Sequence, residues 1–124
     1  MVGDKVKTIF GGMGGRVLPE ELSRGANGCM PACEFADVLA KVMELWWAGD
    51  ERAARALHQR LLPLIIREKH SFMRYVLNRR GVFTSLHERA PSGINALDTD
   101  DKREISLLAQ EIAGDIDAYP FKAE

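Results

Sequence analysis

The sequence predicts an α/β fold in which two parallel strands, joined by a crossover helix, are followed by several more helices. Residues 7–10 form a short apolar run that ends in a cluster of glycines, and residues 25–32 form a second one that ends near Pro31. Each run leads into an amphipathic helical segment, which is the pattern of a strand–helix–strand unit. Ligands bind at the carboxyl ends of the strands in this architecture, so the pattern indicates part of an enzyme.

Length and composition limit the class of protein. The 124 residues suit one domain, and 46% hydrophobic with 28% charged residues is typical of soluble globular proteins. The net charge of −1 argues against a nucleic-acid binder that neutralises many phosphates, and the short basic run at residues 78–80 is predicted to end a helix. No apolar run reaches the ~20 residues of a membrane span. With two cysteines and no secretory signal, a reduced cytoplasmic setting is expected.

The first elements are predicted from apolar runs and turn residues. A buried strand is expected over residues 5–10, followed by a glycine-rich loop over residues 11–15. Pro19 suits the first turn of a short helix, which Gly25 ends in a left-handed conformation. Residues 26–32 are then predicted as the second strand, with little β-branching to support it.

Two long helices are predicted next from apolar residues that recur every three or four positions. The stripe of the first helix consists of Phe35, Val38, Leu39, Val42, Met43 and Trp46. Gly49 ends this helix and Asp50 caps the second. The stripe of the second helix consists of Ala54, Leu57, Leu61, Leu64 and Ile65. Because proline lacks the backbone N–H, a kink or break is expected just before Pro63.

The last part of the chain is predicted to hold two further helices. One runs over residues 70–80, is ended by Gly81, and buries Phe72, Met73, Val76 and Leu77. Residues 82–97 lack periodicity and form a long connection. Asp98 or Thr99 caps the final helix. The stripe of that helix consists of Ile105, Leu108, Ala109, Ile112 and Ile116.

The balance of these elements is lopsided, with two strands and about five helices. Two parallel strands alone cannot bury both faces or satisfy both edges. We therefore expect the strands to be completed by a partner or to belong to a larger sheet.

The glycine-rich loop at residues 11–15 follows a strand and precedes a helix, where bare backbone amides can cradle a carboxylate or phosphate. It matches neither common nucleotide motif. Val17 stands where the dinucleotide pattern needs its third glycine, and residues 15–17 are not the Gly-Lys-Ser/Thr of a P-loop. Two interpretations stay open: a loop that faces a ligand, and a plain turn chosen for its backbone freedom.

The two cysteines are the only hint of a metal site. Cys29 and Cys33 have a spacing that could supply half of a zinc site, but structural zinc needs four ligands. The three histidines, His58, His70 and His87, are isolated on different elements. We therefore predict buried free cysteines that fill space, with no metal and no cofactor.

Four pieces of the sequence resemble one enzyme family in their order and spacing. They are the Ile-Phe-Gly-Gly of residues 9–12, the Gly-x-x-Gly and following apolar residues of 22–30, the Ala-Gly-Asp with later alanines, leucines and proline of 48–63, and the helix of 70–81. In these pieces the chain resembles the C-terminal part of the dihydrodipicolinate synthase / N-acetylneuraminate lyase family of class I aldolases.

This resemblance implies a (β/α)₈ TIM barrel, of which residues 1–48 hold the last two strand–helix units and residues 49–124 form a helical C-terminal extension. It also implies assembly into a homo-oligomer. The implied chemistry is a Schiff base between a lysine of the sixth strand and a 2-oxo acid such as pyruvate, followed by carbon–carbon cleavage, condensation or dehydration.

The family's catalytic groups lie on earlier strands than those resembled here: the lysine, a relay tyrosine and a pair of hydroxyl residues. The resemblance therefore implies no catalytic residue in this sequence and no activity of this chain alone. Lys5 and Lys7 are not replacements, because both would lie at the bottom face of a barrel, away from the ligand end.

Two substrate-binding positions carry over from the resemblance. Gly12 is expected to line the pocket where a larger side chain would intrude, and the backbone of Met30 is expected to approach the 2-oxo acid. Met13 and Cys29 are their neighbours.

A hypothesis from another class is a small helical protein-interaction module without catalysis. It is motivated by the surplus of helices and by the adjacent Trp46 and Trp47. Neighbouring residues cannot share one helix face, so at least one tryptophan is expected to meet another element or a partner.

Overall fold

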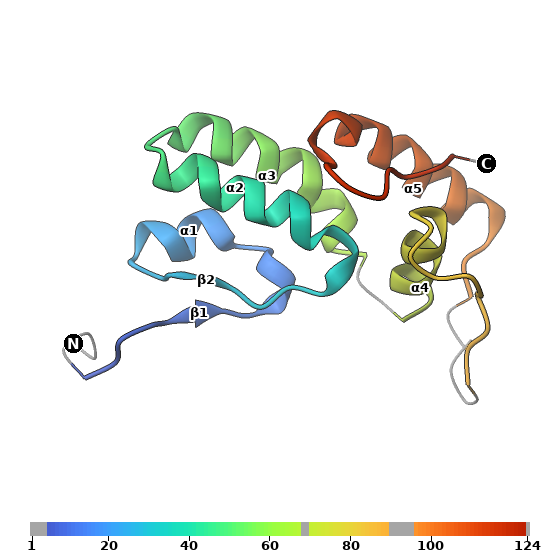
Figure 1. The fold of residues 1–124 in the computed structure, drawn as a ribbon, viewed down its shortest axis with the longest axis horizontal. Helices are drawn as coiled ribbons and strands as arrows, with labels where there is room; N and C mark the ends of the chain where they lie inside the picture. Colours follow the sequence, from blue (N-terminus) through green and yellow to red (C-terminus); the bar gives the residue numbers. More distant parts are fainter. Residues whose placement is uncertain (1–4, 68–69, 90–95, 124) are drawn as a thin grey trace.

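The computed structural model describes residues 5–67, 70–89 and 96–123, and its elements follow the predicted order (Figure 1). The strands are β1 (Phe10–Gly11) and β2 (Gly28–Cys29). The α-helices are α1 (Leu18–Ser23), α2 (Ala36–Trp47), α3 (Glu51–Ile65), α4 (His70–Arg79) and α5 (Thr99–Glu111). Short 3₁₀ turns are η1 (Met13–Gly15), η2 (Cys33–Phe35) and η3 (Ala113–Asp115).

The two strands pair in parallel, with Phe10 opposite Gly28 and Gly11 opposite Cys29, and α1 connects them. This confirms the predicted strand–helix–strand unit. The amide of Ile9 also donates to the side chain of Asn27 at 3.1 Å. The regular strands are much shorter than the predicted 5–10 and 26–32, because in the described part of the chain each strand has one neighbour only.

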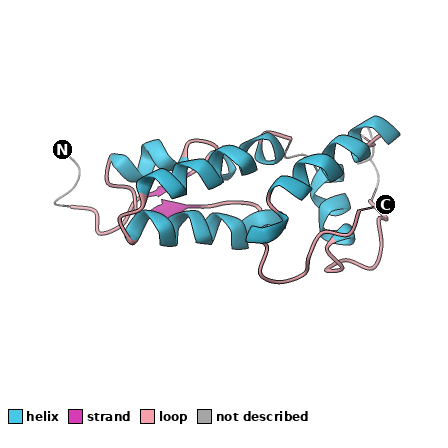
Figure 2. Cartoon of the chain, turned by 90° about the horizontal axis from the view of Figure 1, so that it is seen from above, coloured by secondary structure: helices cyan, strands magenta, loops and turns pink. Residues whose placement is uncertain are grey.

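The helices form a layer on one side of the strands. In Figure 1 the strands run along the lower edge, with α1, α2 and α3 above them. Seen from above, the helices overlap the strands at one end of the molecule, and α4 and α5 gather at the other end (Figure 2). The helices α2 and α3 are joined by a tight turn at Gly49, whose φ of 85° is readily adopted by glycine.

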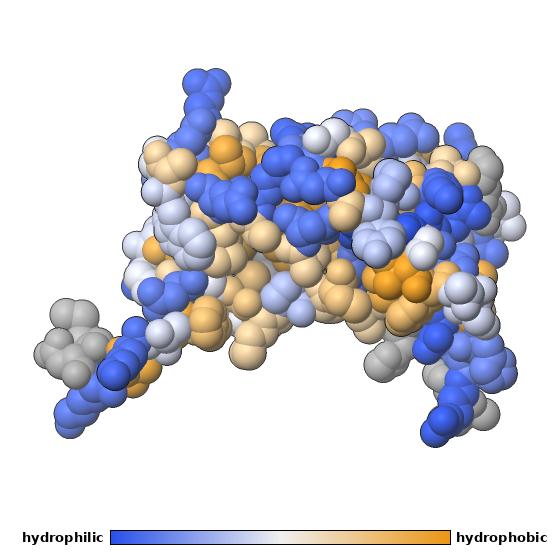
Figure 3. All heavy atoms as spheres, viewed as in Figure 1, coloured by the Kyte–Doolittle hydropathy of each residue, from blue (hydrophilic) through white to orange (hydrophobic). Residues whose placement is uncertain are grey.

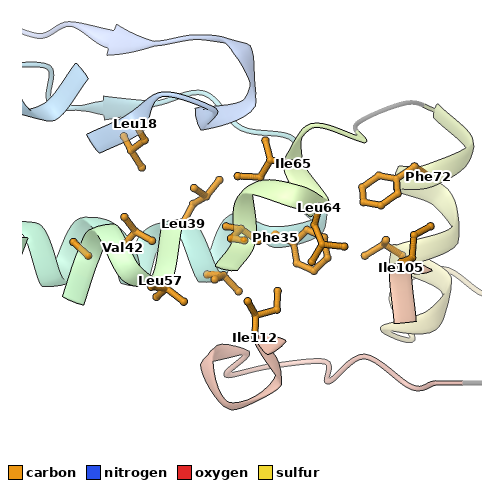
Figure 4. Close-up of a cluster of buried hydrophobic side chains, with 14 of the residues drawn as sticks. Leu18, Phe35, Leu39, Val42, Leu57, Leu64, Ile65, Phe72, Ile105 and Ile112 are labelled. Carbon is orange, nitrogen blue, oxygen red and sulfur yellow. The ribbon is translucent and has the colours of Figure 1, made fainter. Parts of the chain in front are cut away.

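A single cluster of buried apolar residues joins all five α-helices (Figure 4). The predicted stripes supply most of it, including Leu39, Leu57 and Ile105, each at most 3% exposed. Met43 and Trp46 of the α2 stripe, and Met73 of α4, are only partly buried. The division at residue 48 stays a prediction; residues from both sides of it contribute to the same cluster.

The predicted buried strand at residues 5–10 is wrong in its burial. All six residues are exposed, and the side chain of Phe10 keeps 53% of its surface accessible. The reason is geometric: the helices pack on one face of the strand pair, and on the other face Phe10 and Met30 keep more than half of their surface accessible.

Of the kink or break predicted just before Pro63, the break is wrong, since α3 continues from Glu51 to Ile65, and the kink stays a prediction. Pro63 lies in the last turn, where its missing N–H removes only the hydrogen bond to the carbonyl of residue 59. Leu61, Leu64 and Ile65 are buried on both sides of it. Their packing holds the helix through the proline.

The predicted helix starts are confirmed by side-chain caps. The carboxylate of Asp50 accepts from the amide of Ala53 at 3.0 Å, at the start of α3. Asp98 and Asp101 form a reciprocal capping box at the start of α5, with bonds of 2.8 and 3.2 Å. In the described residues, no helix is both long and apolar enough to cross a membrane.

Candidate ligand site at the strand ends

The two predicted substrate-binding residues lie at the same edge of the strand pair. Gly12 follows β1 and Met30 follows β2, and parallel strands bring their carboxyl ends to one edge. The amide of Met30 donates to the carbonyl of Gly11 at 3.0 Å, which extends the contact beyond the regular strands. Both Gly12 and Met30 are exposed, with 65% of Met30 accessible.

We call the side of the strand pair that carries Phe10, Gly12 and Met30 the open face. Side chains alternate along a strand, so Gly11 and Cys29 point the other way, toward the helices. Figure 3 shows hydrophobic residues at the surface along the lower margin of the molecule, the side on which the strands run. The open face is therefore apolar and accessible, which is unusual for a parallel sheet.

The covered face is closely filled. A Cβ atom on Gly11 would lie 1.8 Å from the carboxylate oxygen Oε2 of Glu21, a residue of α1. A Cβ atom on Gly15 would lie 3.2 Å from the sulfur of Cys29 and 3.3 Å from Leu39. Any ligand at the strand ends therefore has to approach from the open face.

The loop between β1 and α1 adopts a left-handed course. Met13, Gly14 and Gly15 have φ angles of 54°, 66° and 82°. The amide of Gly15 donates to the carbonyl of Gly12, and the amide of Arg16 donates to that of Met13, both at 3.2 Å. These two amides are used within the turn, so the described loop does not offer them to an anion. Whether the loop faces a ligand stays a prediction.

A buried histidine, which sequence reasoning had left without a role, holds this loop. The Nε2 atom of His58 lies 2.8 Å from the carbonyl oxygen of Gly15, and the imidazole is 5% exposed. His58 falls within the apolar stripe of α3, three residues before Leu61 and four after Ala54. That position was the available signal, because a polar residue in a buried stripe needs a partner.

The cysteines are not both buried as predicted. Cys29 is half-buried against the helices, and Cys33 is exposed because it begins η2, outside the apolar stripe of α2. Burial raises the pKa of the Cys29 thiol above its ordinary value of 9.0, and the nearby Glu21 carboxylate raises that pKa further. A thiol with a raised pKa is a poor nucleophile at neutral pH.

The described structure also shows where candidate metal ligands and lysines lie relative to this edge. Among the described residues, no three His, Cys, Asp or Glu side chains lie close enough together to hold a metal ion. Lys5 and Lys7 are exposed and precede β1, at the opposite end of the strand from Gly12.

A second polar centre, which the sequence did not predict, lies at η2 and the start of α2, the elements that follow β2 in the chain. Arg80 is buried, and its guanidinium binds both carboxylate oxygens of Asp37 at 3.0 and 2.6 Å. It also donates to the backbone carbonyls of Glu34, Ala118 and Tyr119. Arg80 thus ties η2, the start of α2 and the C-terminal segment together. The sequence had predicted only that the basic run at residues 78–80 ends a helix.

Comparison with solved structures identifies a similar protein. The chain matches dihydrodipicolinate synthase from Rhodopseudomonas palustris with a TM-score of 0.76 and 34% sequence identity. The match covers 84% of this chain and 36% of that chain, so the chain spans about a third of the length of the synthase. No protein-family model and no curated protein matches the chain.

Proposed function

We propose that this chain, whose predicted likeness to the dihydrodipicolinate synthase family is confirmed by that match, supplies the last two strands and the helical extension of a lyase that forms a Schiff base with a 2-oxo acid such as pyruvate. The observation that carries the proposal is 34% identity to the synthase over most of this chain. The parallel pairing of β1 and β2 supports it, because neighbouring barrel strands are parallel.

In this proposal Gly12 and Met30 contact the substrate from the strand ends. No described atom lies within 4 Å of a Cβ built on Gly12, so the space beside it is free for a ligand. Met30 contributes its backbone, which is held beside β1 by the hydrogen bond from its amide to the carbonyl of Gly11. The chain's part in the reaction is to shape the pocket and to exclude water from it.

The covalent catalyst is proposed to come from elsewhere in the barrel. The described strand ends carry no lysine, and Lys5 and Lys7 lie at the opposite end of β1. The family's Schiff-base lysine belongs to an earlier strand. We therefore expect this chain to be inactive alone and to need strands that cover the open face. Assembly of the completed barrel into a homo-oligomer is part of the same proposal.

A complementation experiment tests the proposal. The chain is co-expressed with the segment of the Rhodopseudomonas palustris synthase that it does not match, and the mixture is treated with pyruvate and borohydride. We expect a stable adduct on a lysine of the added segment, detected by mass spectrometry, and none on this chain. An adduct on Lys5 or Lys7 would show that the assignment of the strands is wrong.

Two matched variants show whether association uses the open face. Phe10→Asp places a charge on that face, and Trp47→Asp places one at the end of α2, on a side chain that is similarly exposed at 63%. We expect Phe10→Asp to prevent co-purification of the two pieces and Trp47→Asp to leave it unchanged. The reverse pattern would favour a helical interaction module instead.

A further inference from the structure

Among the described residues, His58 is the side chain of α3 that forms a hydrogen bond with the loop between β1 and α1. Its Nε2 lies 2.8 Å from the carbonyl of Gly15, which is itself buried. A buried carbonyl without a hydrogen-bond donor costs free energy. The N–H of this imidazole supplies the donor for the Gly15 carbonyl. The two residues are 43 positions apart.

The loop needs such an anchor because its backbone is unfavourable by itself. Met13 has a φ of 54°, and left-handed conformations of residues other than glycine persist only where the surroundings hold them. Within the turn, the two closing hydrogen bonds are 3.2 Å long. The shorter bond from His58 attaches the loop to the helical layer, where the neighbouring Leu57 and Leu61 of α3 are at most 2% exposed.

We infer that His58 is a positioning residue for the proposed 2-oxo acid pocket: by donating to the Gly15 carbonyl it fixes the left-handed loop that presents Gly12 and Met13 at the strand end. This inference rests on the proposed function for the identity of the ligand. It gives the helical extension a direct part in shaping the site, because His58 belongs to α3 and the loop belongs to the strand pair.

The chemistry of the bond suggests three substitutions at position 58, one that removes the donor and two that keep it. Leucine at position 58 fills much of the same space and donates no hydrogen bond, whereas asparagine and glutamine keep an N–H donor. His58→Leu should therefore release the loop, and at least one of His58→Asn and His58→Gln should hold it again.

The methionines of the chain provide the readout. Met13 and Met30 lie at the proposed site, and Met73 packs against the core. In the chain labelled with ¹³C at the methionine methyl groups, we expect His58→Leu to shift and broaden the Met13 signal and to leave that of Met73 in place. Amide exchange at Gly15 and Arg16 should quicken by about tenfold relative to the core helices.

A control variant separates loop release from a general loss of stability. Ile105→Val shortens a buried side chain of α5 that packs beside Phe72, away from the loop (Figure 4). It should leave the Met13 signal unchanged. Equal effects of Ile105→Val and His58→Leu, an unchanged Met13 signal in His58→Leu, or no recovery with either amide variant would each overturn the inference.

The same samples distinguish this inference from the proposed function. The Met13 signal and the amide exchange are measured without any 2-oxo acid, so they report on loop positioning alone. In the completed barrel, His58→Leu should raise the KM for pyruvate more than it lowers kcat. If the barrel forms no pyruvate adduct while His58→Leu still releases the loop, the proposed function fails and the positioning stands.

Discussion

The strand pair and the helical layer treat similar side chains in opposite ways. In the helices, apolar residues such as Leu61 and Leu64 are fully buried. On the open face, Phe10 and Met30 keep more than half of their surface accessible. Both regions carry large apolar side chains at the spacing of their secondary structure, so composition does not explain the difference. The difference lies in the packing partners: the helices pack against one another, whereas each described strand has one neighbouring strand.

This contrast indicates where the free energy of folding arises. Burial of apolar area contributes roughly 25 cal/mol per Å², so the packed helices supply most of the stabilisation. The strand pair gains from its covered face alone. A variant in the helical layer should therefore change stability, and a variant on the open face should change association.

The largest expected effect in the helical layer comes from Arg80. Replacing it in Arg80→Met leaves the Asp37 carboxylate and three backbone carbonyls without their donor. Removal of one partner of a buried ion pair costs about 3–5 kcal/mol, and because the Asp37 side chain keeps 27% of its surface accessible we expect a loss near the lower end of that range. Urea unfolding followed by circular dichroism measures the loss.

Arg52→Met is the control for Arg80, because Arg52 is an exposed arginine of α3. Its unfolding free energy should stay within about 0.5 kcal/mol of the parent chain. If both arginine variants lose little stability, the tie between η2 and the C-terminal segment does not contribute to the folded state.

The direct test of the contrast pairs Leu61→Ala with Met30→Ala. Leu61 is fully buried in α3, and truncation of such a leucine costs about 2–5 kcal/mol. Met30 is largely exposed, so its truncation should change the unfolding free energy by less than about 0.5 kcal/mol. A large loss in Met30→Ala would mean that the open face is covered in the isolated chain, for example by a second copy.

Sequence patterns predicted the helical layer well because its interactions are periodic and local. The stripe containing Val38, Leu39 and Val42 placed α2, and Asp50 and Asp98 marked the starts of α3 and α5. The same patterns failed for the burial of residues 5–10, since strand burial depends on neighbouring strands. They also failed at Pro63, where long-range packing outweighs a local preference.

The candidate site was predictable in part. The order of the two strand ends placed Gly12 and Met30 at one edge, because parallel pairing follows from a crossover helix. The bond from His58 to Gly15 and the ion pair of Arg80 with Asp37 each span 43 positions. No periodicity links residues so far apart, so only the folded structure reveals these pairs.

A smaller effect is expected at the boundary between the two regions, at Gly15. The change Gly15→Ala places a Cβ atom at a φ of 82° and within 3.3 Å of Cys29 and Leu39. The left-handed conformation costs an alanine about 1–2 kcal/mol, which thermal unfolding can detect.

Gly12→Ala is the matched control for Gly15, three positions away in the same loop. Its φ is −104° and no described atom lies within 4 Å of the added Cβ. Its unfolding free energy should therefore change by no more than about 0.5 kcal/mol. If Gly15→Ala is equally mild, the loop is free to rearrange and the covered face is less closely packed than its contacts indicate.

The smallest effect concerns pH and compares the half-buried Cys29 of the covered face with the exposed Cys33 of η2. Burial, and then Glu21, raise the pKa of the Cys29 thiol in the folded chain above its ordinary value of 9.0. The unfolded chain therefore loses this proton first as the pH rises, and the folded state is progressively disfavoured. The contribution of the protonated Cys29 thiol to the free energy of unfolding is therefore fully present below pH 9.0, and it is lost as the pH rises through the pKa of the folded chain. The free energy of unfolding of the reduced protein should be lower above pH 9.0 than at neutral pH, and Cys29→Ala should make this decline smaller.

Cys33→Ala is the control, because it changes an exposed thiol and should leave the decline unchanged. An equal decline in the parent chain and in both variants would show that the covered face does not shield Cys29.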